Sequence, residues 1–169
     1  MQDIAGCRLV VPDSFVQEIV IDSFETALKD GLFEGLRMVD RRSKPSNDYR
    51  AVHLIVKTCG KPVEVQLRTA LQHRWAELSE KLSDVIDPKI KYGGGPANVR
   101  SLLTKSSVMI MNLEIMEFNF LDSMYEFPSY STRDGIDFQQ MINHEVSINN
   151  TKKAIFDIMD EMVNLPERY

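Results

Sequence analysis

The spacing of hydrophobic residues changes within the first third of the chain, from a continuous strand-like run to a helical period. The run IAGCRLVV, residues 4–11, is apolar, rich in β-branched side chains and ended by Pro12, so it predicts a buried strand. After Ser14, which offers a helix cap, apolar residues recur at three- and four-residue spacing until Gly31. This spacing predicts a helix that ends at a glycine. The segment LFEGLRMVDRR predicts a strand in its second half, and SKPSND has the composition of a loop.

Two strand-like segments follow, YRAVHLIVKTC and PVEVQLRT, and Gly60-Lys61 between them fits a two-residue type II′ turn. The turn sets a register with three pairs: Lys57 with Glu64, Ile55 with Gln66, and His53 with Arg68. Alternation then places the polar side chains of both strands on one face and the apolar ones on the other. Such a polar face either meets solvent or lines a pocket. We favour a pocket, because His53, Glu64, Gln66 and Arg68 together are chemically versatile.

The second half of the chain has the spacing of helices. A helix begins at about Ala70, and its stripe through Trp75 predicts packing on the sheet, whereas His73 lies on a different stripe. KYGGGP is too rich in glycine for a helix interior, EFPSYSTRDG is typical of a loop, and residues 97–127 and 138–165 carry helical patterns. The pattern predicts an α+β fold with a mixed sheet of about four strands, flanking helices and a helical C-terminal half. We divide it into a nucleotide-binding region, residues 1–96, and a helical extension that packs on it, residues 97–169.

Composition narrows the classes of function. The chain has 169 residues, of which 43% are hydrophobic and 27% charged, as expected for one globular protein. The net charge of −5 disfavours general binding to nucleic acids or anionic membranes, and no apolar run reaches the roughly 18 residues that span a bilayer. A cytoplasmic protein without a membrane partner is expected. Cys7 and Cys59 lie in apolar strand-like runs and are expected to be buried free thiols.

Several side chains offer phosphate chemistry. Asp3 and Glu64 belong to neighbouring strands, and two such carboxylates hold Mg²⁺ while nucleotide phosphates complete its shell. A carboxylate also takes the proton of an attacking hydroxyl. Lys44 and His53 suit phosphate oxygens, and Tyr49 suits stacking on a base. A local basic cluster also occurs, for which we favour a solvated loop over a tRNA-binding surface: Arg37, Arg41, Arg42, Lys44 and Arg50.

The order of three motifs resembles a known family. The segments DIAGCRLVV, KPSNDYRAVH and VEVQLRTALQHRWAELSEK are similar to the synthetase domain of the RelA/SpoT alarmone synthetases, the enzymes of the stringent response. The similarity is greatest to small single-domain members, which include toxin-like enzymes. It covers about Asp3 to Lys81, roughly half of the chain. The resemblance implies a nucleotidyltransferase-like fold and transfer of pyrophosphate from ATP to the 3′-hydroxyl of GDP or GTP, a GTP diphosphokinase activity.

The resemblance also implies a role for each site residue. Asp3 and Glu64 would bind Mg²⁺, and Glu64 would in addition activate the acceptor hydroxyl. Tyr49 would stack on the guanine base, and Lys44 and His53 would contact the phosphates of the acceptor. Gln66 and Arg68 would shape the acceptor pocket, and His73 would lie near the edge of the base.

Two departures from the family open alternatives. The family usually has glycine before the tyrosine, where this chain has Asp48, a residue that also tolerates a left-handed backbone. The family's ATP-binding strand lies upstream of the aspartate, whereas this sequence starts at Met1, so we expect the donor-binding residues to be missing and a sheet edge to be exposed. The alternatives are an inactive nucleotide-binding or regulatory module and a toxin-like enzyme that acts on adenosine nucleotides or the tRNA 3′ end. An exposed edge also favours self-association.

Overall fold

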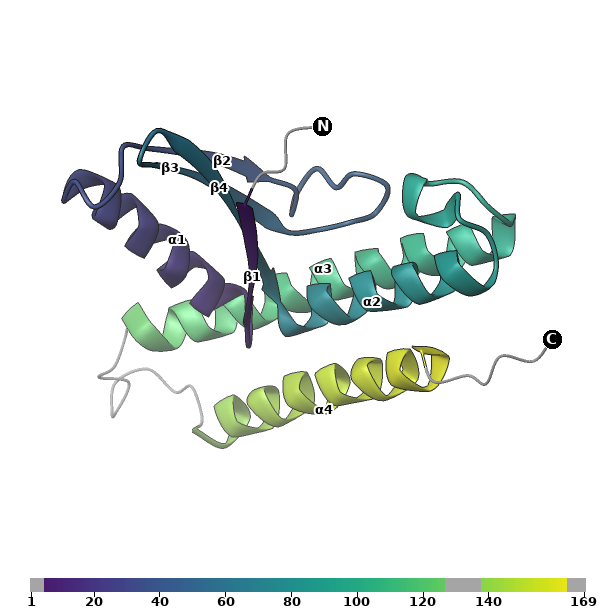
Figure 1. The fold of residues 1–169 in the computed structure, drawn as a ribbon. Coiled ribbons are helices and arrows are strands. Elements are labelled where there is room, and N and C mark those ends of the chain that lie inside the picture. Colours follow the sequence, from purple (N-terminus) through teal and green to yellow (C-terminus); the bar gives the residue numbers. More distant parts are fainter. Residues whose placement is uncertain (1–4, 127–137, 164–169) are drawn as a thin grey trace.

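The computed structural model describes the backbone of residues 5–126 and 138–163 and the side chains of residues 5–124, 141–160 and 162. Its four strands form one sheet in the order β1-β4-β3-β2, shown in Figure 1. The strands are β1 (Ala5–Val11), β2 (Gly35–Asp40), β3 (Val52–Thr58) and β4 (Lys61–Thr69). β1 runs parallel to β4, and the other pairs are antiparallel. The predicted mixed sheet is confirmed.

The helices divide between the sheet and a bundle. α1 (Ser14–Lys29) connects β1 to β2, and α2 (Ala70–Val85) follows β4 directly. A short 3-10 helix, η1 (Ile90–Tyr92), precedes α3 (Ala97–Glu126), and α4 (Phe138–Val163) lies alongside α2 and α3 (Figure 1). The α+β class with a helical C-terminal half is therefore confirmed. None of the described helices has the length and apolar composition to cross a membrane.

Two hydrophobic clusters hold these layers together. One lies between α1 and the apolar face of the sheet and is centred on Val52, Leu54 and Leu67, which are fully buried. The other joins α2, η1, α3 and α4, and Trp75 contributes its ring there at 4% exposure. The Trp75 indole N–H donates to the Leu103 carbonyl at 3.0 Å, so its polar atom is satisfied. The predicted core role of Trp75 is confirmed, but the predicted packing of its stripe on the sheet is wrong, because this face of α2 packs on η1, α3 and α4.

The β3–β4 hairpin differs from its predicted register by two residues. The turn is Cys59-Gly60, with φ of 49° and 72°, and it pairs Ile55 with Glu64 and His53 with Gln66. Two successive positive φ angles fit a type I′ turn, whereas the prediction assumed that glycine stands first. A shift of two residues keeps every side chain on its own face of the sheet. The predicted polar face is therefore present, although the predicted register is wrong.

Three local predictions at the N-terminal end are wrong. β1 is exposed except at Val11, because β4 alone pairs with it among the described residues. The predicted exposed sheet edge is present, but the strand is not buried. Cys7 on β1 and Cys59 in the turn are free as expected, yet both are exposed. The helix cap of α1 is Asp13, whose carboxylate accepts from the Val16 N–H, whereas Ser14 lies inside the helix.

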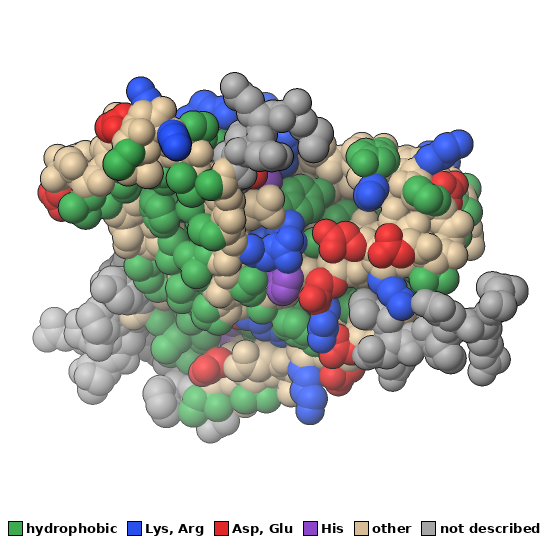
Figure 2. Space-filling view, viewed as in Figure 1, with side chains coloured by type: hydrophobic (Ala, Val, Ile, Leu, Met, Phe, Trp, Pro, Cys, Tyr) green, Lys and Arg blue, Asp and Glu red, His purple; other side chains and the backbone are tan. Residues whose placement is uncertain are grey.

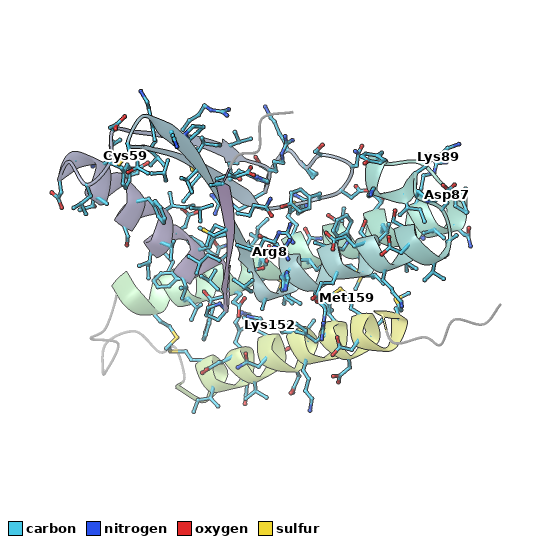
Figure 3. All side chains as sticks on the ribbon, in the orientation of Figure 1. Arg8, Cys59, Asp87, Lys89, Lys152 and Met159 are labelled. Carbon is cyan, nitrogen blue, oxygen red and sulfur yellow. The ribbon has the colours of Figure 1, made fainter. Side chains whose placement is uncertain are left out.

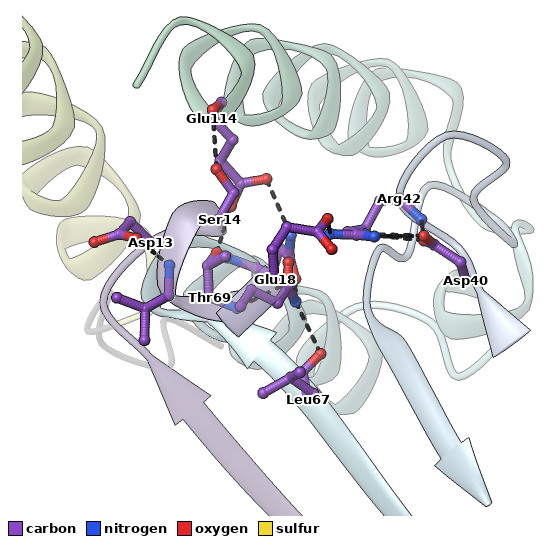
Figure 4. Close-up of polar contacts among 11 residues, drawn as sticks. Asp13, Ser14, Glu18, Asp40, Arg42, Leu67, Thr69 and Glu114 are labelled. Atoms are coloured by element: carbon purple, nitrogen blue, oxygen red, sulfur yellow. Dashed lines mark hydrogen bonds and ion pairs between the residues drawn. The ribbon is translucent and has the colours of Figure 1, made fainter. Parts of the chain in front are cut away.

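A buried polar network centred on Glu114 connects α3 to α1, β4 and α2 (Figure 4). One carboxylate oxygen accepts from the Thr69 hydroxyl at the cap of α2, and the other accepts from the Gln72 amide at 3.0 Å. The Ser14 hydroxyl donates to the Glu114 carbonyl at 3.0 Å. Gln17 of α1 donates to the Leu67 carbonyl and to Gln72. Burial raises the pKa of the Glu114 carboxyl above its usual range.

The predicted loop at residues 126–135 lies outside the described residues, apart from Glu126 at the end of α3. The division of the chain at residue 96 stays a prediction.

Candidate functional site

The polar face of the sheet joins five of the predicted site residues by side-chain contacts. Glu64, Gln66 and Arg68 alternate along β4, and His53 lies beside them on β3. His53 Nδ1 lies 2.7 Å from Glu64 Oε1. Because an ionised carboxylate only accepts, His53 Nδ1 donates this hydrogen bond and Nε2 is left for another partner. The Glu64 side chain keeps 32% exposure, so it stays accessible from solvent.

Tyr49 connects the two ends of this group. Its ring lies edge-on to the His53 ring, with 5.7 Å between the centroids, and the Arg68 guanidinium lies 5.0 Å from its centre. The Arg68 Nε–H donates to the Tyr49 hydroxyl at 3.1 Å, and a second N–H donates to Gln66 Oε1 at 3.1 Å. A continuous chain of contacts therefore runs from Gln66 through Arg68, Tyr49 and His53 to Glu64.

Arg68 carries an uncompensated charge. The residue is 4% exposed, and within the described part of the chain no carboxylate forms an ion pair with it. Its partners are the neutral oxygens of Tyr49 and Gln66. A buried cation without a counter-charge is costly, and an anionic ligand removes that cost. Arg68 is thus positioned to attract a negatively charged group to the face.

Two imidazole nitrogens on this face are also without partners. His53 Nε2 and His73 Nδ1 are buried and make no hydrogen bond with described residues. The other ring nitrogen of His73 lies 3.6 Å from Glu77 Oε1. Burial lowers the pKa of His73, Glu77 partly opposes this shift, and the positive charges of Arg68 and Arg8 add to it. Both rings therefore offer unused hydrogen-bonding positions to a ligand.

Arg8 is a member of this face that the sequence analysis missed. The parallel register pairs Arg8 with Gln66, so it lies on the polar side of the sheet, and in Figure 3 it extends from β1 toward α2. Figure 2 shows basic, acidic and histidine side chains gathered where β1 passes α2. The signal was the alternation within IAGCRLVV, which was hidden by treating the run as buried on both faces.

Two predicted site residues have no described contact with this group. Lys44 is exposed in the loop between β2 and β3, and its predicted phosphate contact stays a prediction. Asp3 lies outside the described residues. Glu64 Oε2 makes no hydrogen bond or ion pair with the described residues, and the side chain is accessible, which suits a hard cation. In the described ranges, no three carboxylate, histidine or cysteine groups converge on one metal position, so a Mg²⁺ site with Asp3 also stays a prediction.

Two arginines of the predicted basic cluster make ion pairs or hydrogen bonds within the fold. Arg42 forms ion pairs with Glu18 of α1 and Asp40 of β2, as Figure 4 shows. Arg50 is 7% exposed and donates to the Ser107 hydroxyl and to the Arg42 carbonyl. These two side chains are not free surface cations, so the solvated-loop interpretation of the cluster is wrong for them.

A cavity of about 350 Å³ lies between α1, α3 and the start of the loop after β2. Its one arginine, Arg42, is already neutralised by the acidic side chains Glu18 and Asp40, which also line the cavity. It therefore lacks an unpaired cation for phosphate. The uncompensated charge of Arg68 and the unpartnered histidines place the candidate site on the polar face of the sheet instead.

Comparison with known proteins identifies what this chain is similar to. Residues 1–83 match the family described as the region found in RelA / SpoT proteins. An uncharacterized protein of Mycobacterium tuberculosis is 40% identical over 96 residues, which are 57% of this chain and 34% of that protein. This chain thus spans about a third of the length of that curated relative.

Solved structures show the same fold. The small alarmone synthetase 1 from Bacillus subtilis aligns with a TM-score of 0.53 and 25% identity, over 75% of this chain and 66% of that one. The same synthetase bound to its product pppGpp aligns with a TM-score of 0.50 and 25% identity, over 74% and 65% of the two chains. The predicted resemblance to small RelA/SpoT-type alarmone synthetases is confirmed.

Proposed function

We propose that this chain, whose residues 1–83 match the region found in RelA/SpoT proteins, binds a guanine nucleotide on the polar face of its sheet and takes part in (p)ppGpp synthesis. The observation that carries the proposal is the buried, uncompensated Arg68 in contact with the Tyr49 ring. A nucleotide complements both residues, since its anionic phosphates suit the charge of Arg68 and the aromatic face of its base suits the Tyr49 ring. The B. subtilis synthetase solved with pppGpp bound supports a guanine nucleotide as the ligand.

The reaction is a pyrophosphoryl transfer. The 3′-oxygen of GDP or GTP attacks the β-phosphorus of ATP, the bond from that phosphorus to the bridging oxygen of the α-phosphate breaks, and AMP leaves. The acceptor hydroxyl loses its proton. Glu64 is the base that takes it, because its carboxylate is accessible and His53 orients one of its oxygens. Glu64 and Asp3 would hold Mg²⁺, which would neutralise charge on the phosphates.

The remaining residues bind and orient the acceptor. Tyr49 stacks on the base, an interaction worth roughly 1–3 kcal/mol in other nucleotide-binding proteins. Arg68 and Gln66 shape the pocket, and the charge of Arg68 is available to the phosphates. His53 Nε2 and His73 Nδ1 supply hydrogen-bonding positions toward the phosphates and the base edge, respectively.

The test is a calorimetric titration of the 169-residue chain with GDP, and then with a non-hydrolysable ATP analogue, both with Mg²⁺. We expect GDP to bind and Glu64→Gln to retain that binding. Tyr49→Ala should weaken it at least about fivefold. A chain that is folded by circular dichroism but does not bind GDP would overturn the proposal. Binding of GDP without product in a synthetase assay would replace the enzyme with a nucleotide-binding module.

A further inference from the structure

The turn that carries Tyr49 has an unusual backbone. Asn47 and Asp48 both adopt left-handed conformations, with φ of 51° and 66°. Asparagine and aspartate tolerate this region better than other side chains, but it still costs more than it does for glycine. Two such residues in a row need contacts that hold them. The Asp48 departure from the family's glycine is therefore not a neutral exchange.

Helix α3 supplies those contacts. The Thr104 hydroxyl donates to the Asp48 carboxylate at 2.6 Å, and the Ser107 hydroxyl donates to the Asp48 carbonyl at 2.7 Å. Thr104 and Ser107 are three residues apart and so lie on one helix face. Arg50 donates to the same Ser107 hydroxyl at 3.0 Å, which ties the other side of Tyr49 to α3 as well. The Asp48 carboxylate is thus turned to α3.

The glycine-rich segment after η1 approaches the turn from another direction. Gly93 has φ of 78°, and a Cβ at this position would lie 2.7 Å from Asn47 Oδ1. Only glycine allows so close an approach without displacing the Asn47 side chain. The turn therefore lies close to the glycine segment as well as to α3.

We propose that Asp48, Thr104 and Ser107 form a latch that positions Tyr49 for the base of the bound nucleotide. This inference rests on the proposed function. The Tyr49 N–H and carbonyl bond to Ser46 at 3.0 and 3.2 Å, so the geometry of the turn fixes the backbone from which the ring extends. A loop already ordered in the free protein loses less entropy on binding. The latch residues are positioning residues, and they set nucleotide affinity more than turnover at saturation.

The test compares variants that open the latch with a matched control. Thr104→Val removes the donor and keeps the side-chain shape, whereas Asp48→Gly removes the acceptor and tolerates the left-handed backbone. The control is Thr151→Val on α4, where the exposed hydroxyl donates only to Ser147 of its own helix. Two quantities are measured: the Kd for GDP, and the hydrogen-exchange rate of the Tyr49 amide without nucleotide.

We expect both latch variants to weaken GDP binding by about three- to tenfold and to accelerate exchange of the Tyr49 amide by a similar factor. Thr151→Val should change neither. Asp48→Asn keeps an acceptor for Thr104, so it should restore most of what Asp48→Gly loses. The turnover number at saturating nucleotide should fall less than twofold.

The Kd for GDP and the exchange rate of the Tyr49 amide test the latch and the proposed function separately. Unchanged exchange and unchanged Kd in both Thr104→Val and Asp48→Gly would overturn the latch. If the unmodified chain does not bind GDP, the proposed function fails and the role of the latch in nucleotide binding fails with it. In that case the exchange rates of the free chain still decide whether Thr104 and Asp48 order the turn.

Discussion

Two glutamates of this protein belong to polar clusters of similar composition but opposite character. Glu64 lies on the sheet face with His53 as its partner and keeps 32% side-chain exposure. Glu114 is 7% exposed, and both of its oxygens accept hydrogen bonds, from Thr69 and Gln72. A carboxylate whose acceptors are already used serves packing, whereas one with a free oxygen and access to solvent is available for chemistry.

The neighbours of each glutamate differ in the same way. Around Glu64, the polar face contains a buried cation and two imidazole nitrogens that have no acidic or hydrogen-bonding partner, respectively, among the described residues. Around Glu114, the partners are the cap of α2 and the termini of other elements, so the cluster joins α1, β4, α2 and α3. The candidate site is distinguished by polar groups whose charge or hydrogen-bonding positions are not satisfied by other described residues, rather than by the number of its polar residues.

The largest expected effect separates the two glutamates by activity. Glu64→Gln should lower synthetase activity by at least about 10³-fold, because it removes the base and one magnesium ligand. The midpoint of urea unfolding should not change, since glutamine still accepts from His53. Glu80→Gln, on the exposed side of α2, is the matched control. Loss of GDP binding and folding together in Glu64→Gln would show that Glu64 is structural.

The second effect concerns stability. Glu114→Ala should reduce the free energy of unfolding by about 2 kcal/mol at pH 7, because the Thr69 hydroxyl and the Gln72 amide lose their buried acceptor. Glu80→Ala should change it by less than about 0.5 kcal/mol. Urea denaturation followed by circular dichroism measures both values. Equal values for the two variants would remove the distinction between Glu114 and a surface carboxylate.

The third effect is a dependence on pH. The ordinary pKa of a glutamate carboxyl is 4.5, and burial raises the pKa of Glu114 in the folded state, so the folded chain binds this proton more tightly than the unfolded one. The stability contributed by Glu114 is therefore highest below pH 4.5 and decreases as the pH rises through the folded-state pKa. Other groups titrate as well, so the quantity to measure is the difference in unfolding free energy between the unmodified chain and Glu114→Gln. A difference that stays constant over this range would contradict the assignment.

The smallest effect lies on the outer surface. Arg74 of α2 pairs with Asp160 of α4 and also with Glu77 at 2.7 Å. Both side chains of the interhelical pair keep about a third of their exposure, so water screens it. Asp160→Asn should lower the unfolding free energy by less than about 1 kcal/mol, and 1 M salt should remove most of the difference. A loss as large as that of Glu114→Ala would mean that α4 depends on this pair.

Much of the candidate site follows from strand alternation in the sequence. The face shared by His53, Glu64, Gln66 and Arg68 depends only on the two-residue period of β3 and β4, which the sequence displays directly. The contact of Tyr49 with Arg68 also needs the left-handed turn at residues 47 and 48, whose geometry depends on support from α3. Arg8 was missed because an apolar run does not reveal whether its strand is buried on both faces or on only one.

The Glu114 cluster could not be predicted in the same way. Thr69 and Glu114 are 45 residues apart, and helical periodicity does not say which side chain of α3 meets the cap of α2. Even Ser14, which resembles a helix cap in the sequence, donates to α3 because Asp13 caps α1. Such pairings depend on how helices are packed in three dimensions, which local spacing does not encode.

In the hairpin that supports the candidate site, a shift of the strand register by an even number of residues differs in its effect from a shift by an odd number. Its pairing could move along β3 and β4 by two residues, and Glu64 would remain on the same side of the sheet as His53, displaced by one pleat. A displacement of one residue would instead turn Glu64 and Gln66 into the hydrophobic layer beneath α1. In evolution or design, changes of register at the Cys59-Gly60 turn should therefore be tolerated in even steps and eliminated in odd ones. A shift by an odd number of residues becomes tolerable only when a β-bulge inserts one extra residue and returns the side chains to their original faces.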